Sequence, residues 1–245
     1  MTTATRATRS LIAAIASMSI VDLTHPLERG MPVYPTHPQF FAMPWQTGDI
    51  ATMNQLLIGE HSGTHFDSPA HFYPDAADPR YLSVADVPLA TTIGAAVKLD
   101  FRGVAANAEV GPDDIRSWER EHRRLASGEA VVFDFGWASK WAPLPEGREF
   151  LAAWPGLTRA AAEYLVERGV RAACTDCLGI DGSATTDLGA HCVLLENHVA
   201  IVESLRALDE LPQEFLLITL PLKIAGGTGS PIRAVALFGR KGGGA

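Results

Sequence analysis

The 245-residue sequence predicts a single α/β domain with a mixed β-sheet and helices packed around it. Apolar runs rich in β-branched residues are interspersed with amphipathic runs, but without the regular strand–helix alternation of an all-parallel sheet. No Gly/Ser-rich or Pro-rich linker and no internal repeat divides the chain. Because 47% of the residues are hydrophobic and 20% are charged, the composition is typical of a globular protein with a substantial core.

Short apolar runs with many valines, isoleucines and phenylalanines are expected to form the strands. A polar–apolar run that leads into the first cluster of histidines is also expected to be extended. In chain order the predicted strands are residues 19–24, 95–100, 130–135, 170–175, 215–220 and 232–238, and the extended run is residues 58–65.

Two helices carry clear end signals. Pro112, Asp113 and Asp114 suit the first turn of a helix that continues over residues 115–125, because proline tolerates that position and carboxylates favour the positive end of the helix dipole. Thr158 is a suitable N-cap and Gly169 a suitable C′ residue for a helix over residues 158–168.

The two ends of the chain are expected to be an N-terminal helix, residues 1–18, and a flexible tail, residues 240–245. Leu11, Ile12 and Ile15 lie on one stripe of that helix, so we expect it to pack on the body of the protein. Arg6 and the apolar residues that follow also resemble a weak signal peptide, which is the alternative interpretation.

Composition excludes several classes of partner. A formal charge of −8 argues against nucleic acid, because phosphate binding needs a basic surface. No apolar run reaches the roughly 18 residues that would span a bilayer. Three cysteines are too few for a disulfide framework and favour a cytoplasmic location. A small-molecule substrate is therefore the expected partner.

The segment His61-Ser-Gly-Thr-His-Phe-Asp-Ser-Pro-Ala-His71 contains three of the eight histidines. In an extended chain the side chains of His61, His65, Asp67 and His71 would share one face. A straight strand would separate His61 from His65 by roughly 13 Å, which is too far for one ion. The segment is therefore expected to bend, and Gly63 is where a bend costs least.

Neutral imidazole and carboxylate ligands suit zinc, manganese or ferrous iron. The absence of cysteine from this segment favours an open catalytic site over a closed structural one. Asp67 has two oxygens and could bridge two ions. His71 lies beyond Pro69, so we expect it to leave the metal and carry protons. Thr64 either orients a ligand or fills a strand position.

The pattern H-x-G-T-H-x-D-x-P-x-H resembles the signature of the cyclase-like metal-dependent hydrolases, a family that includes bacterial kynurenine formamidases and isatin hydrolases. Further segments also resemble the family: residues 21–27, 118–122, 136–137 and 221–233. The resemblance covers roughly residues 18–238. It implies a swivelling β/α/β-like fold and a homodimer or homotetramer.

The resemblance also implies the site. His61, His65 and Asp67 would bind metal, and His191 with Glu203, twelve residues later, would complete a site for one or two Zn2+ or Mn2+ ions. His71 would be the acid and base. The expected reaction is hydrolysis of a C–N bond in a small amide, lactam or cyclic imide by metal-activated water.

Tyr34 is where the family resemblance is weakest, because kynurenine formamidases carry a substrate-contacting tryptophan in this loop. The chain reads Pro32-Val-Tyr-Pro35, so Tyr34 is the candidate substrate-binding residue. Kynurenine formamidase activity and a non-catalytic metal- or ligand-binding protein on the same fold remain the alternatives. Intact His71 argues against the second, because a binding protein has no need of an acid and base.

Three other patterns are discounted. Cys174-Thr-Asp-Cys177 resembles a redox motif, but a loop-like segment follows it instead of a helix. The glycine-rich residues 226–231 lack the lysine of a phosphate loop and are expected to connect strands tightly near the site. Tryptophans 137, 141 and 154 are expected to pack in the core.

Overall fold

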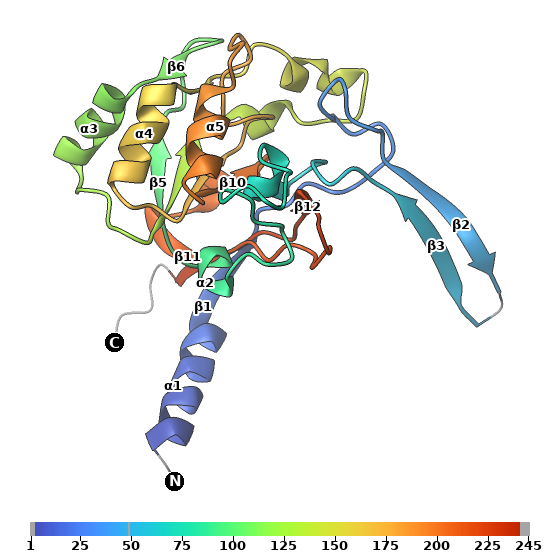
Figure 1. Cartoon of the computed structure of the whole chain (residues 1–245). Coiled ribbons are helices and arrows are strands. Elements are labelled where there is room, and N and C mark those ends of the chain that lie inside the picture. The colour runs from blue at the N-terminus through green and yellow to red at the C-terminus, as the bar shows by residue number, and fades with distance from the viewer. Residues whose placement is uncertain (1–2, 49, 241–245) are drawn as a thin grey trace.

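A nine-stranded mixed sheet is the centre of the computed structural model, in which residues 3–48 and 50–240 are described (Figure 1). The strand order is β1-β13-β11-β5-β7-β9-β10-β4-β12. Strands β5, β7, β9 and β10 run parallel, and the strands outside this block pair antiparallel, so the predicted mixed sheet is confirmed. In sheet order the bounds are β1 Met18–Asp22, β13 Val235–Gly239, β11 Glu214–Ile218, β5 Ile93–Asp100, β7 Ala130–Asp134, β9 Ala172–Thr175, β10 Ala200–Glu203, β4 His65–Asp67 and β12 Gly229–Pro231.

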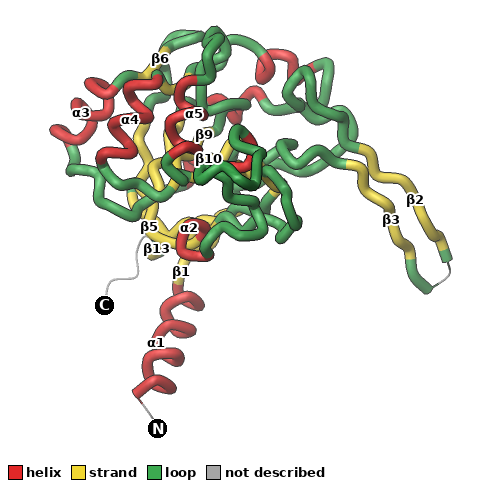
Figure 2. Tube along the Cα trace, viewed as in Figure 1, coloured by secondary structure: helices red, strands yellow, loops and turns green. Residues whose placement is uncertain are grey.

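Two strand pairs lie outside this sheet, and helices α3, α4 and α5 lie side by side over one of its faces (Figures 1 and 2). The two pairs are β2 (Phe41–Thr47) with β3 (Thr52–Leu57), and β6 (Glu109–Val110) with β8 (Gly156–Leu157). The helices are α1 Thr3–Ser17, α2 Leu89–Thr92, α3 Pro112–Glu121, α4 Arg159–Glu167 and α5 Gly189–Glu196, and the 3-10 helices are η1 Pro69–His71, η2 Trp137–Lys140, η3 Glu146–Leu151 and η4 Leu208–Glu210.

The parallel strands are buried on both faces, which explains their continuous apolar sequences. In β7, Val131 and Phe133 pack toward the helices, whereas Ala130 and Val132 pack into a second cluster on the opposite face. All five residues of β7 are buried. The sheet therefore separates two apolar cores, and the adjacent strands β10 and β4 carry polar side chains that converge in the site described next.

The six predicted strands are all present, with boundaries shifted by one to three residues. Thr158 caps α4 by accepting a hydrogen bond from the backbone N–H of Ala161, and Gly169 ends it with a φ of +69°. Helix α3 ends at Glu121, four residues earlier than predicted. The extended run over residues 58–65 is wrong as a strand, because a turn at Glu60 and His61 interrupts it.

The predicted packing of the N-terminal helix is wrong. Helix α1 projects from the body of the molecule (Figure 1), and Leu11, Ile12 and Ile15 are 60%, 61% and 39% exposed. An apolar stripe marks the face that a helix can bury, but it does not identify what covers that face. The C-terminal residues 241–245 of the predicted tail lie outside the described residues. In the described part of the chain, no helix is long and apolar enough to cross a membrane.

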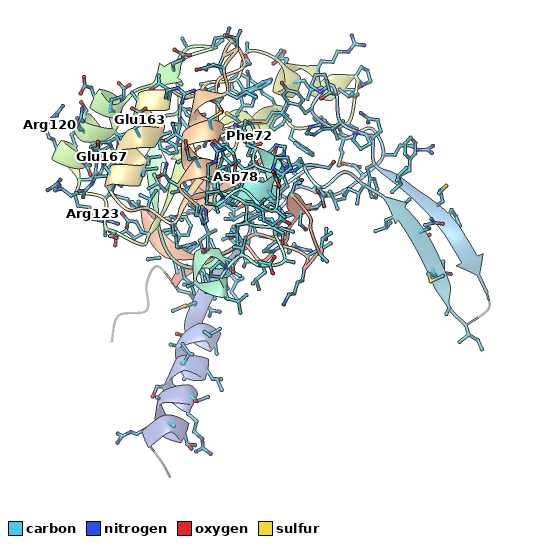
Figure 3. All side chains as sticks on the ribbon, viewed as in Figure 1. Phe72, Asp78, Arg120, Arg123, Glu163 and Glu167 are labelled. Atoms are coloured by element: carbon cyan, nitrogen blue, oxygen red, sulfur yellow. The ribbon has the colours of Figure 1, made fainter. Side chains whose placement is uncertain are left out.

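The hairpin β2–β3 was not predicted, and it is the second projecting element. Its side chains extend away from the body, with no other element beside them in the view of Figure 3. All six residues of β3 are exposed, including Met53, Leu56 and Leu57. At its base, Phe40 packs with Met31 and Val33 against Ile58, which anchors the hairpin beside the candidate site described next.

Candidate metal centre

Strands β4 and β10 place the first polar side chains of the site. His65 and Asp67 alternate along β4 and therefore point to the same side of the sheet. In the antiparallel pair, Glu203 of β10 lies directly opposite His65. All three side chains are buried, with 5%, 1% and 4% of their surface exposed. Three ionisable groups thus converge on two adjacent interior strands, where burial would be costly without compensation.

Gly63 brings His61 back toward His65 and Asp67. Its φ is +64°, a conformation that glycine adopts without strain, and a Cβ added there would lie 2.8 Å from the Leu27 side chain. The ring centroids of His61 and His65 are 5.5 Å apart, far closer than a straight strand allows. The predicted bend at Gly63 is confirmed.

Helix α5 supplies His191 from the other side of the site. The carboxylate of Asp181 accepts hydrogen bonds from the backbone N–H groups of Ala190 (2.7 Å) and His191 (3.0 Å) at the start of this helix. The same carboxylate lies 2.5 Å from Nδ1 of His191. This contact leaves Nε2 of His191 directed at Glu203 Oε1 (3.2 Å) and Asp67 Oδ2 (3.6 Å).

Asp67 is the centre of the donor set. Its Oδ1 lies 2.6 Å from His61 Nδ1 and 3.4 Å from His65 Nε2. Its Oδ2 is buried and has no hydrogen-bond partner among the described residues. Two groups of donor atoms, each within 4.8 Å of one another, share Asp67: His61, Asp67 and His71, and His65, Asp67 and Glu203. Such a shared carboxylate with an unpartnered oxygen fits one or two divalent cations.

The charges of the site are strongly coupled. Burial lowers the pKa of His65, but the carboxylates of Asp67 and Glu203 outweigh burial and raise it to about 9. Burial raises the pKa of Glu203, but His191 and His65 outweigh burial and lower it to about 2. Without a cation, His65 and His191 therefore hold protons between the carboxylates. A divalent ion bound here would displace those protons, which makes metal affinity dependent on pH.

His71 lies at the end of η1, and its ring stacks on His61 with centroids 3.7 Å apart. Burial lowers the pKa of His71 to about 4, with Asp67 opposing the shift and His61 adding to it. We predicted that His71 would lie outside the metal ligands. Its nitrogen lies within 4.8 Å of donor atoms of His61 and Asp67, so the geometry allows both a ligand and a proton carrier.

A cavity of about 230 Å³ opens onto these donors. Tyr34, the candidate substrate-binding residue, lines it and is 39% exposed. Phe72 forms part of the wall and stacks on His191 at 5.1 Å, within the crowded centre of the molecule (Figure 3). The remaining apolar wall is formed by Trp154, Leu178 and Leu188. The cavity thus combines a polar floor with largely aromatic and aliphatic walls.

Sequence reasoning missed three residues of the site. His37 lines the cavity three positions after Tyr34, and its Nδ1 lies 3.1 Å from the backbone oxygen of His61. Phe72 directly follows the histidine motif. Asp181 lies in the loop that follows β9. The one local signal that could have identified Asp181 as a site residue was its position in a loop after the buried strand β9, two residues beyond Gly179.

The discounted cysteines belong to neither group of donor atoms. Cys174 and Cys177 are free and fully buried, and burial raises the pKa of Cys174 to about 12. A thiol with such a pKa is a poor nucleophile at neutral pH. The predicted core tryptophans are 7% exposed at Trp137 and 8% at Trp154, and Trp141 is half-buried.

Comparison with known proteins agrees with this geometry. Residues 21–182 match the model of the Cyclase family, described as "Putative cyclase". An isatin hydrolase from Roseibium aggregatum is 34% identical over 207 residues, which cover 78% of this chain and 76% of that protein. A kynurenine formamidase from Erythrobacter litoralis is 28% identical over 220 residues, which cover 88% of this chain and 92% of that protein.

Solved structures share the whole fold. An isatin hydrolase bound to the product analogue thioisatinate has a TM-score of 0.88 at 28% identity, covering 98% of this chain and 100% of that one. A structure described as a potential metal-dependent hydrolase with cyclase activity has a TM-score of 0.71 at 26% identity, covering 91% and 99%. The chain therefore belongs to the Cyclase family of metal-dependent hydrolases.

Proposed function

We propose that the protein hydrolyses a C–N bond of a small amide, lactam or cyclic imide. His61, His65, Asp67, His191 and Glu203 would hold the divalent cation. The observation that carries this proposal is the Asp67 carboxylate, shared by two groups of nitrogen and oxygen donors in the floor of one cavity. Two relatives, an isatin hydrolase and a kynurenine formamidase, support C–N bond hydrolysis.

We infer that the cation is Zn2+ or Mn2+, because imidazole and carboxylate donors without thiolate suit both ions. The site would hold one or two of them. Two ions are favoured by the pair of donor groups that meet at Asp67, since one carboxylate can place an oxygen on each.

When bound, a divalent cation polarises the substrate carbonyl and makes a water molecule acidic enough to lose a proton near neutral pH. His71 would accept that proton at a ring nitrogen, because its depressed pKa of about 4, caused mainly by burial, leaves the ring neutral at pH 7. His71 would then donate the proton to the departing nitrogen. Amide nitrogen leaves poorly unless it is protonated, so this second transfer is required.

The cavity walls favour a cyclic or aromatic substrate. Tyr34, Phe72 and Trp154 present ring faces or edges around the polar floor, and aromatic side chains bind planar rings well. Tyr34 would contact the substrate at the cavity wall. Kynurenine formamidase activity is the second candidate, supported by the relative from Erythrobacter litoralis, which this chain matches over 92% of its length.

Elemental analysis of the purified protein, paired with a substrate panel, tests the proposal. The panel contains isatin, other lactams, cyclic imides, simple amides and N-formylkynurenine. We expect hydrolysis of at least one cyclic or aromatic amide, loss of activity with a chelator, and recovery with Zn2+ or Mn2+. Turnover of N-formylkynurenine alone would favour the second candidate. A metal-replete protein that hydrolyses none of these compounds would contradict an enzymatic role.

We also infer a homodimer or homotetramer that covers the projecting hairpin. Met43, Met53, Leu56 and Leu57 are 48% to 57% exposed, and a two-stranded hairpin is marginally stable in water by itself. Sedimentation should give a mass above one subunit, and Leu56→Asp should lower it. Leu89→Asp, which changes an exposed leucine of α2, is the control. A monomer at micromolar concentration would contradict the inference.

The cysteines support a reducing compartment. All three are free, and Cys192 is half-buried, so a cytoplasmic location is proposed.

A further inference from the structure

The glycine-rich segment at residues 226–231 lies directly against the candidate metal centre. Its last three residues form β12, which pairs with β4 on the side opposite β10. Two of its glycines approach site residues too closely for any side chain. A Cβ at Gly229 would lie 2.5 Å from Cε1 of His61, and a Cβ at Gly227 would lie 2.7 Å from Oε1 of Glu60. The backbone of this segment therefore packs on His61 and Glu60.

Between these glycines, Thr228 connects Glu60 to His61. Its hydroxyl donates a hydrogen bond of 2.6 Å to Oε2 of Glu60, and its backbone N–H donates to the same oxygen at 3.1 Å. Nε2 of His61 lies 2.8 Å from the Thr228 hydroxyl oxygen. A hydroxyl has a single proton to donate. Because Glu60 takes that proton, the Thr228 oxygen can only accept from His61, so Nε2 of His61 carries a hydrogen.

The consequence concerns the other nitrogen of His61. Nδ1 of His61 lies 2.6 Å from Asp67 Oδ1, so without metal it donates a hydrogen to this carboxylate. When that hydrogen is lost, the hydrogen held on Nε2 leaves the lone pair on Nδ1, which faces the centre of the site. The two other imidazoles are held the opposite way. Nδ1 of His65 bonds the backbone oxygen of Gly63 at 2.8 Å, and Nδ1 of His191 bonds Asp181. Those two rings therefore turn Nε2 toward the centre of the site.

We propose that Glu60 and Thr228 are positioning residues that fix the tautomer of His61, so that His61 offers Nδ1 to the cation while His65 and His191 offer Nε2. This inference rests on the proposed metal-binding function for its affinity test, but the hydrogen that Thr228 holds on Nε2 of His61 is a property of the metal-free protein. A hydrogen-bond partner on the outer nitrogen of a ligating histidine orients the ring and strengthens binding. The glycine-rich segment is thus part of the metal centre.

The test compares Thr228→Val, Thr228→Ser and Glu60→Gln with the wild-type protein. Thr219→Val is the matched control, because the Thr219 hydroxyl donates to the backbone oxygen of Thr92 instead of a site residue, and Thr219 lies outside the cavity. Long-range ¹⁵N–¹H spectra of labelled histidines report the protonated ring nitrogen of His61. Competition with a chromogenic chelator reports the affinity for Zn2+.

In the wild-type protein we expect a hydrogen on Nε2 of His61 both without metal, where Nδ1 also donates to Asp67, and with Zn2+, where only Nε2 carries a hydrogen. Thr228→Val should remove the acceptor for the Nε2 hydrogen, favour the form of His61 with its hydrogen on Nδ1, and weaken Zn2+ binding about 10- to 100-fold. Thr228→Ser should restore both properties, and Thr219→Val should change neither. A Thr228→Val protein that keeps the Nε2–H form and full affinity would overturn the proposal. A wild-type protein that binds no divalent cation would instead overturn the proposed function, and the spectra would still judge the tautomer.

Discussion

The carboxylate of Asp181 lies 2.5 Å from Nδ1 of His191 and accepts two backbone hydrogen bonds from the start of α5. Asp181 is 3% exposed, so solvent does not compete for these contacts. One buried residue thus fixes both the helix that carries His191 and the orientation of its ring.

Asp181→Asn should therefore weaken metal binding. The amide keeps the shape of the carboxylate but loses its charge and can place an N–H against Nδ1, which favours the wrong tautomer of His191. We expect about 10- to 100-fold lower affinity, measured by chelator competition. Asp187→Asn is the control, because Asp187 is exposed and pairs with Arg159 instead of the imidazole. Equal affinity in the two variants would contradict this role.

His71→Ala should separate chemistry from metal binding. If His71 carries protons, its removal lowers kcat by about 10²- to 10⁴-fold while metal content stays unchanged. His65→Ala should lose both, because His65 lies between Asp67 and Glu203. Metal analysis and turnover measured on the same samples distinguish a metal ligand from a proton carrier. His122→Ala is the control, because His122 is an exposed histidine distant from the site. Loss of metal from His71→Ala would assign His71 to the ligands.

His25 should make the protein less stable in acid. Burial, with a smaller contribution from Arg206, lowers the pKa of His25 to about 3, whereas the unfolded chain has a pKa near 6.5. Between these values the unfolded state binds the extra proton, so this contribution to stability is complete above pH 6.5 and is lost as pH falls toward 3.

His25→Phe removes the titrating group and retains an aromatic ring against Trp141, on which His25 stacks at 4.0 Å. In urea unfolding of the metal-free proteins, the stability difference between wild type and variant should change by up to about 1.4 kcal/mol per pH unit between pH 6 and 4. A difference that is constant over this range would show that His25 titrates normally.

Gly229→Ala should disrupt the site through packing alone. The added methyl group would lie 2.5 Å from the His61 ring and 2.7 Å from the backbone oxygen of Phe66, so one of them must move. We expect reduced metal content and a lower Tm. Gly239→Ala, at the end of β13, is the matched control because its Cβ would meet no atom within 4 Å. Wild-type metal content in Gly229→Ala would refute the contact.

The sequence alone predicted the parts of the site that local chemistry determines. The sequence placed the bend at Gly63. Two histidines four residues apart can reach one ion only if the backbone between them bends, and a bend costs least at glycine. His191 and Glu203 were different. They reach Asp67 through the pairing of β10 with β4 and through the start of α5, and the short apolar run of β10 gave no indication of its partner strand. Only the family resemblance identified them.

The same limit explains the errors in the fold. The stripe of Leu11 and Ile15 correctly indicated a helix, but a stripe does not show whether its own chain covers it. Hairpin β2–β3 was missed because Pro44 and the bulge between Pro44 and Gln46 interrupt the alternation that identifies a strand. Asp181 was overlooked because its partner nitrogen comes from a helix that the sequence did not predict.

Both ends of the projecting hairpin continue into residues that line the cavity. Strand β2 follows Tyr34 and His37, which line the cavity, and β3 continues through Ile58 into His61, which also lines it. Phe40 and Ile58 pack together where the hairpin joins the body. A neighbouring subunit that covers the hairpin would therefore contact an element that continues directly into Tyr34, His37 and His61 of the cavity.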